Sequence, residues 1–561
     1  MADYYIFVFI ELSKTMGNLK IILSALVAGM SLSSCQQPKT AETTKRPNIV
    51  FIMTDDHTIQ AMSAYGSKLV KTPNLDRIAN EGMLFNNCFV TNAVCGPSRA
   101  TILTGKYSHL NGLTDNSKVF DSTQVIYPQL LKKAGYQTAM IGKWHLGSTP
   151  MGFDYYSILP NQGQYYQPEF LENGKLIKEQ GYVTDVITDK AIGFLEKRDH
   201  DKPFMMIYQH KAPHRNWLPA PRHLGMFDNT VFPEPDNLLD DFNNRGRAAK
   251  EQLMNISTDM WPAWDLKMLS TAQLDSMAKL PKENFKDAKG DDYKHANDPS
   301  LDKARFFEVY NRMTDEEKVK WRKVYDKRVA EFKKLNPKGA DLVRWKYQQY
   351  MRDYLACVVS VDENVGRLMD YLKKIGELDN TIIVYTSDQG FFLGEHGYFD
   401  KRFMYDESFR TPLLVRYPAS IKAGSVSNAF AVNLDFAPTL LDYAGVKIPD
   451  DMQGVSLRPL LDNAGKAPEN WRKAVYYHYY EYPSWHAVKR HYGIRTERYK
   501  LIHFYNDVDE WELYDMQKDP KEMKNLYGDK TYQPVIKELK AQLEKLQLQY
   551  KDTNPTETIT K

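Results

Sequence analysis

Short apolar runs separated by helical stretches dominate the first 450 residues of the chain. The runs at 48–54, 137–141, 204–208 and 381–386 are apolar on both faces, a pattern typical of buried strands in a parallel sheet. Helix signals fall between them, at 72–79, 127–134 and 350–375. This alternation predicts an α/β fold with a large, mostly parallel sheet flanked by helices.

Two regions depart from the alternation. Residues 233–342 are rich in lysine and aspartate and helical in places, notably at 314–335, which predicts an insertion on the surface of a catalytic domain at 46–445. Residues 446–550 predict a smaller C-terminal subdomain, in which an antiparallel sheet is followed by a closing helix. Its strands are predicted at 474–480, 492–495 and 499–503, its helix at 534–549, and a polar, disordered tail at 551–561.

The N-terminus has the pattern of a targeting segment. An apolar run at 21–30, too short to cross a membrane, follows Lys20, and small residues then lead to Cys35. This pattern resembles a bacterial lipoprotein signal. We therefore predict a signal peptide at 1–35, with Met16 as an alternative start, and a tether at 36–45. The mature protein would be a periplasmic or cell-surface lipoprotein, anchored to the outer membrane through lipid on Cys35. An uncleaved signal and an ordinary secretory signal are the alternatives.

Composition narrows the class of protein only a little. The chain has 561 residues, of which 42% are hydrophobic and 26% charged, with a net charge of +3, which is an ordinary globular balance without support for a nucleic-acid partner. There are four cysteines. If Cys35 carries lipid and Cys95 is modified, as argued below, only Cys88 and Cys357 remain. The sequence leaves open whether these two pair or stay as free, buried thiols.

Polar side chains follow three of the predicted strands at the point where each strand ends. They are Asp55 with Asp56, His210 with His214, and Asp388 with Gln389. Ligands of open α/β sheets collect at the carboxyl ends of the strands, so these segments should meet. Carboxylates converging there repel by roughly 4 kcal/mol per close pair at an effective dielectric near 20. A hard divalent cation relieves that repulsion, and carboxylate and amide oxygens are the ligands that calcium and magnesium prefer. Alone, Asp55-Asp56 would be an ordinary turn or capping pair.

The segment Cys95-Gly-Pro-Ser-Arg99 predicts the start of a helix that ends with Gly105 as its cap. A cysteine at a helix start lies beside unpaired N–H groups and the positive end of the helix dipole. A thiol there can become a nucleophile with a lowered pKa. The alternative is a buried, structural cysteine ahead of a capped helix.

This segment and its continuation to Lys106 resemble the signature of the type I sulfatases, in the alkaline phosphatase superfamily, and the similarity extends from about Arg46 to about Leu526. In that family a formylglycine-generating, sulfatase-maturing enzyme oxidises this cysteine to formylglycine, whose hydrated aldehyde is the nucleophile. The resemblance implies that one calcium ion is held by Asp55, Asp56, Cys95, Asp388 and Gln389. Two positions depart from the family pattern. Gly96 stands where the family usually has Ser, Thr or Ala, and Gln389 stands where it usually has Asn. Gln389 nevertheless keeps an amide oxygen.

Further catalytic residues follow from the same resemblance. Lys143 and His145 are two positions apart, so in an extended chain they face the same way, and a cation beside an imidazole suits sulfate binding and proton transfer. The resemblance implies that Lys143 and Lys401 bind sulfate, that His145 helps to eliminate it, that His214 protonates the leaving alcohol, and that Arg99 binds the modified cysteine. Without the resemblance, Lys143 and His145 would be interpreted as solvent-exposed residues at the rim of the sheet. Lys401 would be interpreted as part of a solvent-exposed turn. We expect His210 to be a core residue or to support the site from behind.

The segments 105–112, 391–412 and 476–482 resemble the branch of the family that contains N-acetylglucosamine-6-sulfatases. This implies hydrolysis of the 6-O-sulfate of N-acetylglucosamine or glucosamine in glycosaminoglycan (heparan sulfate or heparin) fragments, or in mucin glycans. We expect sugar contacts from Arg490 and His491, with a basic strand edge as the alternative. Other hypotheses are a sulfatase for another position, such as 2-O-sulfate, a phosphodiesterase or phosphomonoesterase of the same superfamily, and a non-enzymatic glycan-binding lipoprotein.

Overall fold

The computed structural model describes residues 46–280, 298 and 301–557. The predicted signal peptide, the tether and Cys35 lie outside these residues and stay predictions, as do the predicted domain boundaries. Within the described part of the chain, no helix combines the length and apolar character needed to cross a membrane.

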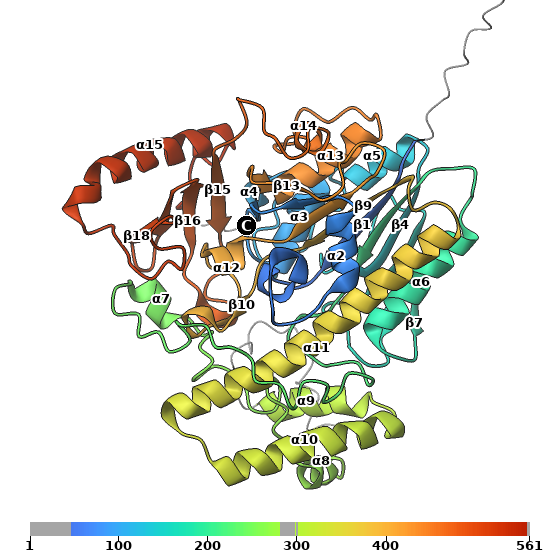
Figure 1. Cartoon of the computed structure of the whole chain (residues 1–561), viewed down its shortest axis with the longest axis vertical. Coiled ribbons are helices and arrows are strands. Elements are labelled where there is room, and N and C mark those ends of the chain that lie inside the picture. The colour runs from blue at the N-terminus through green and yellow to red at the C-terminus, as the bar shows by residue number, and fades with distance from the viewer. Residues whose placement is uncertain (1–45, 281–297, 299–300, 558–561) are drawn as a thin grey trace, which may run out of the picture. The chain divides into compact units, whose positions relative to one another are not determined.

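A ten-stranded sheet forms the centre of the fold (Figure 1). Its middle is a parallel block in which each strand pairs with the next, and the predicted parallel sheet is confirmed there. The order in this block is β9 (Thr381–Ser387), β1 (Asn48–Thr54), β8 (Phe204–Gln209), β4 (Gln137–Lys143) and β5 (Tyr155–Leu159). Antiparallel pairs extend the sheet on both sides, through β12 (Leu413–Arg416) and β2 (Met83–Phe85) beyond β9, and through β6 (Glu169–Glu172) and β7 (Lys175–Lys178) beyond β5. At the outer edge, β13 (Ser425–Ser427) pairs with β2 in parallel.

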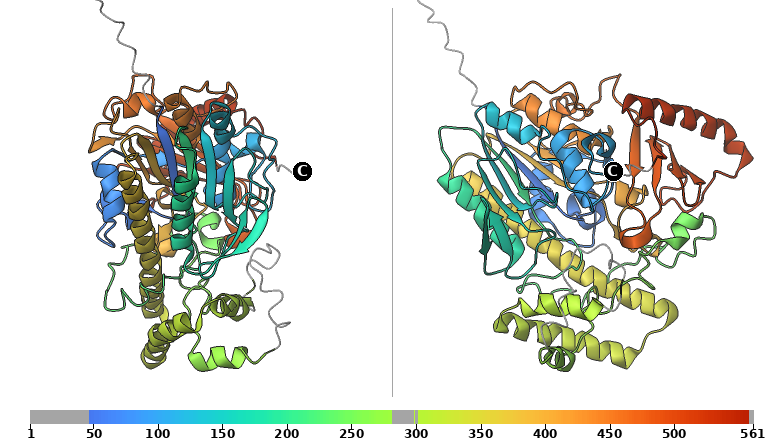
Figure 2. Two further views of the ribbon diagram at one scale, coloured as in Figure 1. Left: turned by 90° about the vertical axis from the view of Figure 1, so that its right-hand side faces the viewer. Right: turned by 180° about the vertical axis from the view of Figure 1, so that it is seen from behind.

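Helices cover both faces of this sheet (Figure 2). Val50 and Ile52 of β1 belong to the hydrophobic core beneath one helix layer, whereas Phe51 and Met53 belong to the core beneath the other. The first layer consists of α2 (Pro73–Asn80), α6 (Val183–Lys197) and α11 (Gly339–Lys374); the second consists of α3 (Cys95–Thr104), α5 (Tyr127–Lys133), α13 (Phe436–Tyr443) and α14 (Arg458–Leu461). Burial on both faces explains why the central strands are continuously apolar.

The charged segment 233–342 carries α7 (Arg247–Glu251), α8 (Thr271–Met277), α9 (Asp302–Asn311), α10 (Asp315–Leu335) and the start of α11. Thr314 caps α10 by accepting a hydrogen bond from the Glu317 N–H, as its sequence favours. Trp321 and Tyr325 of α10 are buried in the same core as Tyr350 of α11. The segment therefore shares the core of the main sheet, and α11 begins at Gly339 and not at Tyr350 as predicted.

The C-terminal region forms a four-stranded antiparallel sheet with one long helix, α15 (Gln533–Gln549) (Figures 1 and 2). The strands are β15 (Ala474–Tyr479), β16 (His491–Thr496), β17 (Tyr499–Phe504) and β18 (Glu510–Asp515). The small sheet and closing helix were predicted, whereas β18 was not. A third hydrophobic core joins this sheet to Phe89 and Phe409 of the preceding region.

The start of the predicted tail is not free of the fold. The carboxylate of Asp552 is buried and accepts hydrogen bonds from the Tyr476 hydroxyl (2.6 Å) and from Nδ1 of His478 (2.7 Å). The disorder expected from residue 551 onward is therefore wrong for Asp552, because a buried carboxylate needs such partners. Residues 558–561 lie outside the described part of the chain.

The two cysteines left over in the sequence analysis do not pair. Cys88 and Cys357 are both buried, free thiols. Burial raises the pKa of Cys357 to about 12 and that of Cys88 well above its usual value. Both thiols are therefore uncharged and unreactive at neutral pH.

Candidate active site

The carboxyl ends of β1 and β9 bring three carboxylates to one edge of the sheet. The two strands pair directly, with Thr54 opposite Ser387, so Asp55, Asp56 and Asp388 follow side by side. Oδ1 of Asp388 accepts the backbone N–H of Asp56 over 3.2 Å. Oxygens of the three buried carboxylates lie within 4.8 Å of one another. The sheet edge therefore assembles the acidic cluster that strand-end reasoning predicts.

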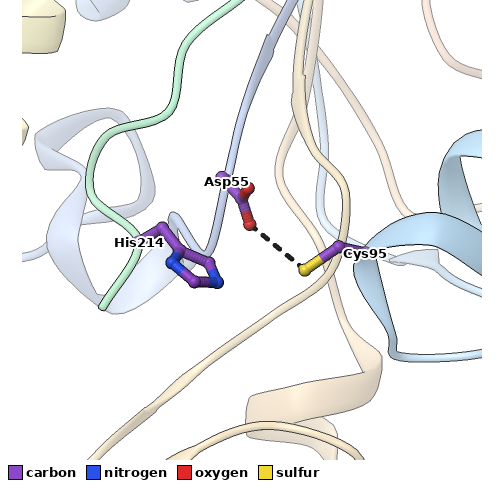
Figure 3. A group of neighbouring side chains, drawn as sticks. All are labelled: Asp55, Cys95 and His214. Carbon is purple, nitrogen blue, oxygen red and sulfur yellow. Dashed lines mark hydrogen bonds between the residues drawn. The ribbon is translucent and has the colours of Figure 1, made fainter. Parts of the chain in front are cut away.

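Cys95, the first residue of α3, points at this cluster (Figure 3). Its Sγ donates to Oδ1 of Asp55 over 3.4 Å. Burial, and then the charge of Asp55, raise the pKa of the thiol well above its usual value. The expected lowered-pKa thiol is thus wrong for the unmodified side chain, because desolvation beside a carboxylate outweighs the helix start. Unmodified, Cys95 is a poor nucleophile.

The acidic cluster has the ligands and the electrostatics of a cation site. Burial raises the pKa of Asp56 to about 7 and that of Asp388 to about 6, and the charge of Asp55 adds to both shifts. Gln389 donates from Nε2 to Oδ1 of Asp56 (2.6 Å), while its buried Oε1 has no hydrogen-bond partner among the described residues. Carboxylates that resist ionisation and an unpartnered amide oxygen together fit a hard divalent cation.

Three cationic side chains surround the cluster. Lys143 contacts Oδ2 of Asp55, and Nζ of Lys401 lies 2.7 Å from Oδ1 of Asp56. Burial opposes the charge of Lys401, but Asp400 and Asp56 raise its pKa well above the usual value. Arg99 makes an ion pair with Asp388. All three side chains are therefore paired with carboxylates of the cluster beside Cys95.

Two histidines complete the group predicted from sequence. His214 faces Cys95 (Figure 3), with Nε2 3.8 Å from Oδ2 of Asp56, and its Nδ1 donates to the carbonyl oxygen of Arg215 (2.6 Å). Nε2 of His145 lies 2.9 Å from Nε2 of Gln162, which donates to it. Burial, and then the charge of Lys143, hold the pKa of both histidines well below the usual value. Their neutral forms are therefore favoured.

His210 lies apart from this group. It is fully buried, its ring packs edge-on against Tyr208 with centroids 4.4 Å apart, and neither ring nitrogen has a hydrogen-bond partner among the described residues. Burial lowers its pKa to about 3. His210 is thus a core residue, one of the two expectations from sequence.

A cleft of about 460 Å³ opens above Cys95, His214 and Lys401. Much of its wall comes from residues that sequence reasoning missed: Asn116, Gln162, Trp264, Glu308, Arg312, Arg402, Trp485 and His486. A turn signal did mark one of these positions, because Pro160-Asn-Gln-Gly163 follows β5 directly and turns carry functional side chains.

The structure does not bring Arg490 and His491 into the cleft. His491 is fully buried, with Nδ1 donating to the Lys489 carbonyl (2.8 Å) and Nε2 accepting the Met404 N–H (3.1 Å). Arg490 donates to the carbonyl of Tyr480 over 2.8 Å. The expected sugar contacts are therefore unsupported, because β16 turns His491 inward. The C-terminal region reaches the cleft instead through Trp485 and His486.

Comparison with protein families places these residues within known sequence patterns. The family model described as "Sulfatase" matches residues 47–446, and the model described as "N-sulphoglucosamine sulphohydrolase, C-terminal" matches residues 394–549. The first match covers the sheet, both helix layers apart from α14, and the acidic cluster. The second covers Lys401 and the C-terminal sheet.

Individual relatives agree with the family match. The chain is 59% identical over 537 residues to an N-acetylglucosamine-6-O-sulfatase of Bacteroides thetaiotaomicron, covering 95% of this chain and 92% of that protein. It is 30% identical to the human N-acetylglucosamine-6-sulfatase, covering 78% of this chain and 68% of that protein. A solved structure of a protein in complex with its substrate D-glucosamine-2-N,6-O-disulfate superposes with a TM-score of 0.86 at 60% identity, covering 91% of this chain and all of that one.

Proposed function

The chain belongs to the sulfatase family, and we propose that it removes the 6-O-sulfate of N-acetylglucosamine or glucosamine in glycosaminoglycan fragments or mucin glycans. It is an enzyme that hydrolyses sulfate esters. One observation carries the proposal: Cys95, His214 and Lys401 line one cleft, beside the acidic cluster and Lys143, in a chain 59% identical to a 6-O-sulfatase. The substrate of the solved relative, which bears a 6-O-sulfate, also supports it.

We propose that the metal of this site is calcium, held by Asp55, Asp56, Asp388, Gln389 and the converted residue Cys95. When bound, the ion supplies positive charge for the oxygens of the transferring sulfuryl group. Conversion of Cys95 to formylglycine by a sulfatase-maturing enzyme supplies the oxygen nucleophile that the buried thiol cannot be. The unpartnered Oε1 of Gln389 supports this ligand set, and the high pKa of the Cys95 thiol supports the need for conversion.

The remaining steps fall to side chains of the chain itself. Lys143 and Lys401 present ammonium groups beside Cys95, where they would bind the sulfate oxygens and stabilise their charge as sulfur is attacked. His214 donates its Nδ1 proton to the Arg215 carbonyl, so Nε2 is the atom that would hold the proton for the leaving sugar oxygen. The negative charge of a bound sulfate ester opposes the effect of Lys143 and favours that proton. His145, kept neutral by burial and Lys143, is suited to accept a proton when sulfate leaves.

A panel of sulfated sugars tests the proposed function. Matured protein would be assayed for sulfate release from 6-O-, 2-O- and 4-O-sulfated mono- and disaccharides, and for phosphate release from the 6-phosphate of N-acetylglucosamine. We expect the 6-O-sulfated compounds to be hydrolysed with kcat/KM at least about a hundredfold above the others, since a difference near 3 kcal/mol suffices. Preference for a 2-O-sulfate or for the phosphate ester would refute it.

We also propose that the mature protein is attached to a membrane through lipid on Cys35. The apolar run at 21–30 and the small residues before Cys35 support this. Labelled fatty acid should be incorporated into the full chain but not into its Cys35→Ala variant. Equal labelling of both would refute the anchor.

A further inference from the structure

The rim of the cleft carries two tryptophans on segments far apart in the chain. Trp264 lies in the charged segment before α8, and Trp485 in the loop between β15 and β16; both are half-buried and line the cleft. Most other lining residues are polar or charged. The two indoles are therefore the main aromatic surface at this opening.

The loop that carries Trp485 is held in a conformation that L-residues rarely adopt. His486 and Ala487 have φ of 67° and 49°, in the left-handed region. The His486 carbonyl accepts the Leu253 N–H (2.6 Å), and Nδ1 of His486 donates to the Leu253 carbonyl (2.6 Å). Nε2 of His486 lies 3.2 Å from Oδ2 of Asp400, the neighbour of Lys401. Strained backbone that persists in this way is characteristic of functional sites.

Helix α9 fixes both tryptophans from behind. The guanidinium carbon of Arg305 lies 5.4 Å from the ring centroid of Trp485 and 5.3 Å from that of Trp261. A cation over an aromatic face orients the ring, and here it occupies one face of Trp485. Asp302, at the start of α9, accepts the backbone N–H of Trp264 over 2.6 Å. Helix α9 thus orients the Trp485 ring through Arg305 and anchors the backbone of Trp264 through Asp302.

We propose that Trp485, held by Arg305, and Trp264 form the platform that binds the sugar ring of the sulfated substrate, and so select carbohydrate over other sulfate esters. The inference rests on the proposed function. The faces of a pyranose expose C–H groups, which pack on aromatic rings, whereas its edges carry hydroxyls that need polar partners. The inner end of the cleft holds Lys401 and His214, which suit the sulfate and the leaving oxygen. The aromatic rim suits the pyranose ring to which the sulfate is attached.

Kinetics of matched variants test the platform. We would measure kcat and KM for N-acetylglucosamine 6-sulfate, and the inhibition constant of inorganic sulfate, in Trp485→Ala, Trp485→Phe and Trp264→Ala. We expect Trp485→Ala to raise KM about tenfold and Trp264→Ala to raise it severalfold, with Trp485→Phe between Trp485→Ala and wild type because a ring remains. Sulfate inhibition should stay the same, since sulfate binds at the inner end.

Two further variants separate ring binding from general damage. Trp345→Ala removes a half-buried tryptophan of α11, which packs on Phe332 with centroids 4.5 Å apart, and should leave KM unchanged. Arg305→Lys keeps the charge but loses the planar group that lies over the Trp485 and Trp261 rings, so KM should rise less than in Trp485→Ala. If Trp485→Ala does not fold, Trp485→Phe and Arg305→Lys still decide the question through their rise in KM.

Three results would overturn the inference: a wild-type KM in Trp485→Ala, equal KM values for the Ala and Phe variants, or weaker sulfate inhibition in step with the higher KM. Failure of the proposed function looks different, since wild-type protein would then prefer another sulfated sugar. The same variants, assayed on that sugar, would still test the platform.

Discussion

Oδ2 of Asp388 accepts two hydrogen bonds from Arg99, over 3.1 Å from Nε and 2.9 Å from Nη2. Both side chains are buried, and Arg99 also donates to Oε1 of Gln209 over 2.8 Å. The pair joins α3, which carries Cys95, to the end of β9, which carries the acidic cluster. Arg99 therefore positions the nucleophile relative to the metal ligands.

We predict that Arg99→Ala lowers the free energy of unfolding by about 3 kcal/mol or more, because it leaves the Asp388 carboxylate buried without its partner. Urea denaturation of wild type and variant measures this. The control is Arg458→Ala, whose pair with Asp442 is partly exposed and should contribute less than about 1 kcal/mol. Equal losses in the two variants would contradict the role given to Arg99.

Calcium should stabilise the protein independently of turnover. At a calcium concentration about 100 times the dissociation constant, binding adds about 2.7 kcal/mol to the folded state, so the melting temperature should rise with calcium and fall again with chelator. Asp55→Asn and Asp388→Asn should lose most of this response. Asp451→Asn, which changes a surface pair with Lys106, should keep it. An Asp55→Asn variant that calcium stabilises as much as wild type would refute the ligand set.

Gln162 links the two residues of the Lys143-Trp-His145 segment. Its Oε1 accepts from Nζ of Lys143, and its Nε2 donates to Nε2 of His145. We predict that Gln162→Leu lowers kcat about tenfold or more, as loss of a side chain that orients catalytic groups does. Gln180→Leu changes an exposed glutamine outside the cleft, so it is the matched control and should change kcat much less. Steady-state kinetics on the 6-O-sulfated sugar measure kcat for both variants. An equal loss of kcat in the two would argue against Gln162 as a positioning residue.

His210 should make stability depend on pH. Its pKa is about 3 in the folded protein and near 6.5 in the unfolded chain, so below pH 6.5 the unfolded chain takes up the proton first. Stability is then complete above pH 6.5 and falls as the pH drops towards 3, by about 2 kcal/mol at pH 5. His210→Leu should remove this part of the loss between pH 7 and pH 5 in urea denaturation. An unchanged pH dependence would show that His210 finds a partner for its proton.

Much of the site was predictable because it depends on regular structure. A strand apolar on both faces must be central, and neighbouring parallel strands end at one edge, so Asp55 and Asp388 could be placed together without knowing any loop. The start of α3 was equally readable from Pro97 and Gly105. Gly105 does take φ of 65° at the helix end.

The walls of the cleft were not predictable in the same way. Gln162 follows Asn161, which has φ of 50°, and Trp485 precedes His486, which has φ of 67°, so both loops contain left-handed residues that the apolar pattern does not predict. The sequence analysis placed His491 in the substrate site, but the sequence does not show which side of the strand its side chain faces. In β16 the side chain faces the interior. The strand β18 was missed because Glu510, Glu512 and Asp515 weaken its apolar pattern.

The central claim is that sulfate esters are cleaved through a converted Cys95. The most direct test measures the rate of sulfate release from N-acetylglucosamine 6-sulfate against the fraction of residue 95 in the aldehyde form, determined by mass spectrometry. Preparations made with and without the maturing enzyme supply the range. The account predicts a rate proportional to that fraction, reaching zero when every Cys95 is a thiol. A fully unconverted preparation that releases sulfate at a comparable rate would contradict it.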